Sequence, residues 1–167
     1  MKLEGIHHVT CITGDILRNV DFYTRVLGLR LVAKSVNQDD PSVYHVFYSD
    51  EQGAPGADIT FFEYKHAARG RPGPGMVHRV LWRVGSTDAL AFWARRLAGE
   101  GIPAKREPER LVFPDPEGLE HELVLDRSPD EPRIADHPEI PSEHALEAPE
   151  GELARDLGMV EIGRAHV

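Results

Sequence analysis

The sequence has a single cysteine, Cys11, and no long apolar run. One cysteine excludes a disulfide within the chain and is typical of a reducing cytoplasm, so we interpret Cys11 as a small buried hydrophobe and not as a nucleophile. No apolar stretch approaches the roughly 18 residues of a membrane helix, and the first residues do not resemble a signal peptide. The composition therefore predicts a cytoplasmic protein that does not span a membrane.

Positive charge is also in short supply. Lys and Arg number 19 against 28 Asp and Glu, which gives a net charge of -9 at pH 7. Nucleic acid and anionic membrane surfaces are bound through clustered basic residues, and the only concentrated basic stretch here, 65–71, is one short loop. The charge balance therefore argues against both kinds of partner. What remains is a globular domain whose 167 residues are enough for a sizeable core.

The first part of the chain has the pattern of one strand, one helix and three strands. Alternation predicts a strand at 6–13, and apolar residues at helical spacing predict a helix over 16–27 that Gly28 ends. In the last strand, Glu63 has the opposite parity to Thr60, so we expect Glu63 to face solvent. The three strands that follow the helix are expected at 29–36, 43–48 and 57–64.

The pattern then begins again after a linker rich in Gly, Pro and Arg. The two parts align at an offset of 71 positions, which matches Gly14 with Gly85 and Phe22 with Trp93. A fixed offset that preserves turns and an aromatic anchor indicates a duplication. The second set of elements is a strand at 76–84, a helix around Trp93, and short strands at 103–105, 110–113 and 119–125.

The duplication predicts an α+β fold of two paired βαβββ modules, 3–64 and 75–126, within one domain of residues 1–126. The strands would form a curved mixed sheet with the helices outside. A concave inner face of this kind is a natural place for a ligand or a metal.

Two adjacent histidines, His7 and His8, lie in the first predicted strand. Successive side chains of a strand face opposite sides, so one imidazole can line the cavity while the other packs beside it. A neutral imidazole on a rigid strand is a good metal ligand. Two ordinary histidines on a half-buried strand are the alternative.

These features resemble the vicinal oxygen chelate superfamily, which includes glyoxalase I, fosfomycin- and bleomycin-resistance proteins, and extradiol ring-cleaving dioxygenases. The resemblance covers roughly residues 3–126 and rests on 7–10, 22–23, 27–29, 115–118 and 122–123. Among its members, the chain is most similar to dioxygenases that open hydroquinone-type rings. That closer resemblance rests on 5–10, 19–23, 44–45, 50–56 and 60–62.

The resemblance implies a non-haem Fe(II) enzyme, with Mn(II) as the alternative metal and O2 as co-substrate. Its substrate would be a small dihydroxylated aromatic ring. It implies His8 as a metal ligand, and Thr10 as a supporting polar residue. The other candidates are His7 as a supporting residue, Glu122 as a ligand or a solvated carboxylate, and Tyr44 and His45 as substrate contacts or a sheet aromatic pair.

A self-contained metal site would draw on four strand positions, which here hold His8, Thr60, Arg79 and Glu122. Arg79 is a permanent cation that would repel a divalent metal, and Thr60 is a poor ligand. In the resembled dioxygenases, which are about twice as long, the remaining iron ligands come from the last module. We therefore expect the N-terminal part of such an enzyme, truncated and inactive alone.

Two alternatives of other classes stay open. One is a small-molecule binding protein of the bleomycin-resistance type, and the other is a glyoxalase-like metal-dependent isomerase with a site assembled in a dimer. Thr60 and Arg79 weigh against the isomerase. Strand edges left exposed by missing modules would allow a homo-oligomer.

The remaining residues have a different character. Residues 127–151 are rich in Pro and acidic residues and predict a linker, and 152–161 resemble the end of the first helix and are interpreted as the remnant of a third module. Residues 162–167 can be encoded by ATC GGA AGA GCA CAC GTC, which matches a common sequencing adapter, so we interpret them as an artefact. Histidines in polar or loop contexts are assigned no role: His66, His121, His137 and His144.

Overall fold

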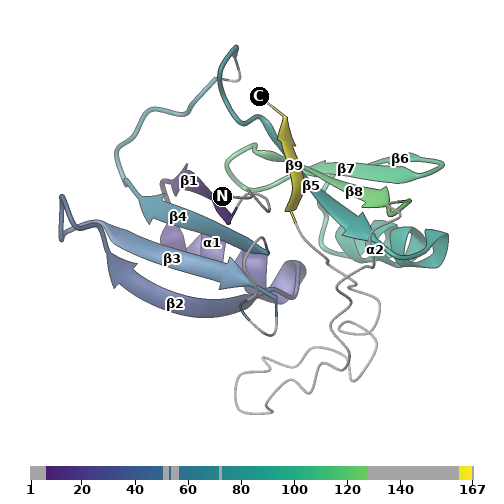
Figure 1. Ribbon diagram of the computed structural model, residues 1–167, viewed down its shortest axis with the longest axis horizontal. Coiled ribbons are helices and arrows are strands. Elements are labelled where there is room, and N and C mark those ends of the chain that lie inside the picture. Colours follow the sequence, from purple (N-terminus) through teal and green to yellow (C-terminus); the bar gives the residue numbers. More distant parts are fainter. Residues whose placement is uncertain (1–6, 51–52, 54–56, 72, 128–161, 167) are drawn as a thin grey trace, which may run out of the picture.

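The computed structural model describes residues 7–50, 53, 57–71, 73–127 and 162–166 (Figure 1). Apart from Arg127, the predicted linker and the predicted remnant of a third module lie outside these residues. Among the described helices, none is long and apolar enough to cross a membrane.

The first module forms a four-stranded sheet, sheet A, in the order β1-β4-β3-β2 (Figure 1). β1 runs parallel to β4, whereas β4, β3 and β2 pair antiparallel. The strands lie close to their predicted positions, because each alternating apolar run is bounded by turn residues. They are β1 (His8–Thr13), β2 (Arg30–Val36), β3 (Tyr44–Ser49) and β4 (Asp58–Glu63).

The first helix is α-helical only in part. α1 (Ile16–Asp21) begins at Asp15, whose side chain accepts hydrogen bonds from two backbone N–H groups of the first turn. The chain then widens into a π-helical segment, η1 (Phe22–Val26), where a continuous α-helix was predicted. The wider turn lets the consecutive residues Phe22 and Tyr23 both lie buried. Gly28, at φ 72°, ends the helix as predicted.

The second module, together with residues 162–166, forms sheet B, in the order β6-β7-β8-β5-β9. Its helix α2 (Thr87–Gly99) begins at Ser86, whose hydroxyl accepts from the backbone N–H of Ala89. β9 pairs antiparallel with β5, and the adapter origin of the residues that form it stays a prediction. The strands are β5 (Arg79–Val84), β6 (Lys105–Glu107), β7 (Arg110–Pro114), β8 (Glu120–Leu125) and β9 (Ile162–His166).

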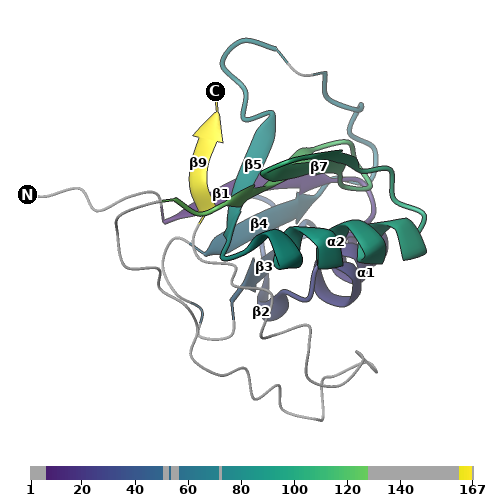
Figure 2. The same ribbon diagram turned by 90° about the vertical axis from the view of Figure 1, so that its right-hand side faces the viewer.

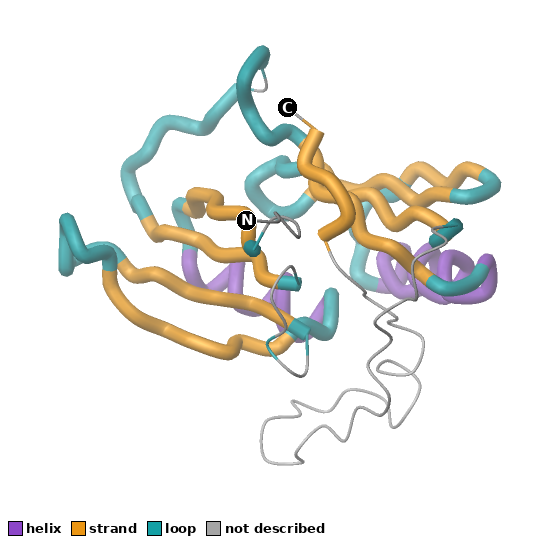
Figure 3. The backbone as a smooth tube through the Cα atoms, viewed as in Figure 1, coloured by secondary structure: helices purple, strands orange, loops and turns teal. Residues whose placement is uncertain are grey.

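Both modules share one hydrophobic core. The helices cover one side of each sheet (Figures 2 and 3), and the end of α2 meets the end of the first helix. The contact between the helices includes Arg96 of α2, which donates from Nε to the carbonyl of Val26 at 2.7 Å. The loop before β8 adds Glu117, whose Oε1 accepts from the Thr13 hydroxyl and the Gly14 N–H. The predicted α+β fold of paired βαβββ modules is confirmed.

One residue on the helix side corrects the prediction. Glu63 was expected to face solvent but is only 7% exposed, and its Oε1 accepts from the backbone N–H of Ile16 at the start of α1. The strand parity relative to Thr60 was sound. The error lay in which side of the sheet meets water, because the helix covers the side that carries Glu63.

Candidate functional site

The side of sheet A that faces away from the helices carries three of the six predicted site residues, His8, Thr10 and His45, and we call it the His8 face. Strand pairing places His8 beside Asp58 and Thr10 beside Thr60. On β3, His45 pairs with Phe62, so its side chain lies on the same side. The members of the His8 face are His8, Thr10, Ile12, His45, Phe47, Ser49, Asp58, Thr60 and Phe62.

The histidine pair lies at one end of this face. The Nδ1 atoms of His7 and His8 are 3.1 Å apart, and the two rings meet edge to face. His7 Nδ1 also lies 3.9 Å from Asp58 Oδ2. Thr10 receives a hydrogen bond from the Thr60 hydroxyl at 3.0 Å. The structure thus brings the three predicted residues of β1 and its approach together, with the His8 imidazole exposed.

The two predicted substrate contacts are separated. His45 lies on the His8 face, where its ring centroid is 4.0 Å from that of Phe47 and 3.9 Å from that of Phe62. Burial, together with the charge that His8 can carry, lowers the pKa of His45. Tyr44 has the opposite parity and lies on the other side of the sheet, with Lys34 Nζ 4.1 Å from its ring centroid. Only His45 can therefore share a site with His8.

Glu122 lies on the corresponding side of sheet B, which we call the Arg79 face. Its carboxylate is 5% exposed and accepts from Arg79 Nη1 at 2.6 Å, while its other oxygen lies 3.3 Å from Arg110 Nη1. Arg79 also holds Glu120 at 2.7 Å. Both oxygens of Glu122 are therefore engaged by guanidinium groups. The members of the Arg79 face are Arg79, Leu81, Arg83, Arg110, Val112, Pro114, Glu120, Glu122 and Val124.

The donor set decides how well these residues fit the metal that the resemblance implies. Among the described residues, no three His, Cys, Asp or Glu side chains lie close enough together to hold a metal ion. The exposed His8 imidazole fits one ligand position. Glu122 does not fit a second, because two arginines already hold it. Cys11 adds no ligand either, since burial first and the charge of Asp115 second raise the pKa of its thiol to about 12.

Sequence reasoning missed two polar residues of the His8 face. Within the described part of the chain, five buried side-chain N or O atoms have no hydrogen-bond partner, and three of them belong to this face. These three are His45 Nε2, Ser49 Oγ and Asp58 Oδ1. Asp58 and Ser49 carried no signal in the sequence, because their neighbours on the face come from other strands.

His121, which was assigned no role, is a buried link between the modules. The Trp82 indole N–H donates to His121 Nδ1 at 2.9 Å, so the proton of the neutral ring is on Nε2, which faces the Tyr23 hydroxyl at 2.9 Å. Tyr23 in turn donates to Asp115 Oδ2 at 2.9 Å. Burial lowers the pKa of His121 to about 3. The role is structural, because the side chain has no exposed surface.

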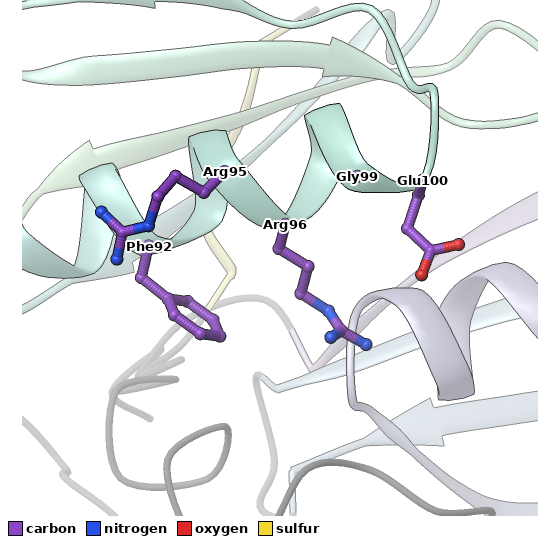
Figure 4. Close-up of a pocket in the computed structure, with 5 residues that line it drawn as sticks. All are labelled: Phe92, Arg95, Arg96, Gly99 and Glu100. Atoms are coloured by element: carbon purple, nitrogen blue, oxygen red, sulfur yellow. The ribbon is translucent and has the colours of Figure 1, made fainter.

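A groove of about 400 Å³ lies on α2, on the helix side of the molecule, away from the His8 face. Its lining residues are Phe92, Arg95, Arg96, Gly99 and Glu100 (Figure 4). The guanidinium of Arg96 points toward the first helix, where it is bonded to main-chain carbonyls. The groove contains none of the predicted site residues.

Comparison with known proteins adds the family. Residues 5–128 match the model of the Glyoxalase/Bleomycin resistance protein/Dioxygenase superfamily. The chain is 43% identical over 131 residues to "Putative ring-cleaving dioxygenase MhqA" of Bacillus subtilis (strain 168), an alignment that covers 75% of this chain and 42% of the relative. It is 30% identical over 153 residues to the chlorohydroquinone/hydroquinone 1,2-dioxygenase of Sphingobium indicum, covering 87% of this chain and 47% of the relative.

A solved structure agrees with these relatives. The crystal structure of a dioxygenase, also named as putative, from Bacillus subtilis superposes with a TM-score of 0.68 at 44% identity, covering 73% of this chain and 40% of that one. The chain thus spans less than half the length of each of these proteins. With the family model matched over both modules, the chain belongs to the Glyoxalase/Bleomycin resistance protein/Dioxygenase superfamily.

Proposed function

We propose that the chain is the N-terminal part of an Fe(II)-dependent dioxygenase that opens small dihydroxylated aromatic rings. Its relatives carry ring-cleaving names, one of them specifying hydroquinone. The observation that carries the proposal is the exposed His8 imidazole on β1, at the position where the resembled dioxygenases place their first iron ligand. Since the described residues supply one ligand position, the others would come from parts of a longer protein.

The described side chains would then have distinct tasks. His8 would hold the metal, and the contact with His7 would orient its ring. The hydrogen bond between Thr10 and Thr60 links β1 to β4 in the middle of the His8 face. Bound Fe(II) would supply coordination positions for O2 and the ring oxygens. The lowered pKa of His45 keeps its ring neutral near pH 7, so the ring would accept a proton from a ring hydroxyl group of the substrate.

Oxygen uptake with hydroquinone and Fe(II) tests the proposal on this chain and on the full-length protein. We expect turnover by the full-length protein and little by the 167-residue chain. His8→Ala in the full-length protein should abolish turnover, whereas His66→Ala, at an exposed loop histidine, should leave it unchanged. Rapid turnover by the short chain would refute the argument from missing ligands.

The same preparations distinguish the binding-protein alternative. Stoichiometric iron in the full-length protein that is lost with His8→Ala supports the dioxygenase. Tight binding of an aromatic ligand that does not change when metal is removed would favour sequestration instead.

A further inference from the structure

The unpaired polar atoms of the His8 face need a physical explanation. A buried donor or acceptor without a partner destabilises the folded state, and native proteins rarely tolerate several in one place. Here three of the five such atoms among the described residues lie on one face of one sheet. A face that concentrates unmet hydrogen bonds is suited to a ligand that supplies the missing partners.

Strand register places these atoms on either side of a row in the middle of the face. Asp58 lies beside His8, and because Tyr48 pairs with Ile59, the next residue, Ser49, lies beside Asp58. His45 lies two residues before Phe47, which pairs with Thr60, and four residues before Ser49. The polar atoms thus flank a middle row whose hydroxyl group, on Thr60, is already bonded.

The same face offers an aromatic surface. The ring centroid of His45 lies 4.0 Å from that of Phe47 and 3.9 Å from that of Phe62, and all three residues are only half-buried. On the helix side of the same strands, Tyr48 and Phe61 are fully buried in the core. Half-exposed rings beside unpaired polar atoms suit a planar ligand that stacks and hydrogen-bonds at its edge.

The charges narrow the ligand class. The Asp58 carboxylate, 15% exposed, accepts hydrogen bonds but donates none when ionised. The Asp58 carboxylate therefore accepts a hydrogen bond from the hydroxyl group of a ring and repels a ring that bears a carboxylate. Ser49 lies beside Asp58, so its hydroxyl can donate to or accept from the same ring hydroxyl group, whereas neutral His45, four residues away on β3, suits a second one.

We propose that Asp58, with Ser49 and His45, forms the subsite that recognises the hydroxyl groups of an uncharged aromatic ring and discriminates against carboxylated rings. This inference rests on the substrate class of the proposed function. It adds the residues that select the substrate, and it replaces Tyr44, which lies on the other side of the sheet.

Anaerobic, metal-free titration of the 167-residue chain with hydroquinone, followed by amide NMR shifts, tests the subsite. We expect shifts in β3 and β4 around Ser49 and Asp58. Asp58→Asn should weaken hydroquinone binding about tenfold and reduce the preference for hydroquinone over 4-hydroxybenzoate by a similar factor. Ser49→Ala, which deletes one hydroxyl, should weaken binding with less effect on that preference.

The matched control is Asp39→Asn, which removes the same charge from an exposed turn and should change neither affinity nor preference. Unchanged shifts of sheet B amides report that each variant is folded. Hydroquinone shifts confined to another surface, or an unchanged preference in Asp58→Asn, would overturn the inference. Because no metal or O2 is present, the subsite can fail while oxygen uptake by the full-length protein succeeds, and the reverse.

Discussion

The His8 face and the Arg79 face are equivalent sides of the two sheets, but their polar side chains are paired very differently. On the Arg79 face, Glu122 is held between two arginines and Glu120 by one. On the His8 face, Asp58 has an oxygen with no partner among the described residues, and the His8 ring is exposed. The offset of 71 matches His8 with Arg79, so the contrast centres on one equivalent position.

This contrast indicates how a duplicated fold divides its tasks. Ion pairs that engage both oxygens of a buried carboxylate, as they do for Glu122, stabilise the sheet but leave that carboxylate unavailable to a ligand. Unmet hydrogen bonds cost stability and remain available for binding. The second module is thus the structural support, and the first carries the candidate chemistry.

The largest effect is expected for Arg79→Ala. Glu122 would remain a buried carboxylate with only Arg110 at 3.3 Å, and breaking such a pair costs about 3 kcal/mol. Urea unfolding followed by circular dichroism measures the loss. The double variant Arg79→Met/Glu122→Leu, which removes both charges, should recover most of the stability. A change below about 0.5 kcal/mol for Arg79→Ala would break the comparison.

The stability of the fold should depend on pH through His121, which lies on the opposite side of β8 from Glu122. The folded pKa of His121, about 3, lies below the ordinary value of 6.5, so the unfolded chain binds more protons between these values. Stability should therefore fall as pH drops from 6.5 toward 3, by up to about 1.4 kcal/mol per pH unit from this group. Denaturant unfolding at a series of pH values measures the slope.

The control for this slope is His121→Phe, which should flatten it whatever its effect on overall stability. Burial raises the pKa of neighbouring Asp115, which acts in the opposite direction, and the difference between the two proteins isolates the histidine. An equal pH dependence of stability in the unmodified chain and in His121→Phe would show that groups other than His121 cause the acid sensitivity.

The smallest effect on stability is expected for His8→Ala. The ring is exposed, and its polar contact is to His7, itself 66% exposed, so the free energy of unfolding should change by less than about 0.5 kcal/mol. The same urea measurement applies. A loss as large as that of Arg79→Ala would show that the His8 face is also a structural surface, and the division between the modules would not hold.

Local patterns were enough to predict much of the fold. Strand and helix positions follow from apolar periodicity, and the ends of the whole first helix, α1 with η1, follow from Asp15 and Gly28. The offset of 71 also predicted that Arg79 occupies the position equivalent to His8, and both residues lie at the start of their strands. The π-helical segment was not predicted, because Phe22 and Tyr23 are compatible with either helix until core packing selects between them.

The sequence by itself determined the duplication and the element order, and it predicted His8 and not Arg79 as a metal ligand. Only the tertiary structure decided which side of sheet A meets water, and hence that Glu63 is buried. Only the structure placed Asp58 beside His8 and joined His121 to Tyr23. Parity assigns a side chain to one side of a strand, but which side is covered, and by which distant residue, depends on packing between elements.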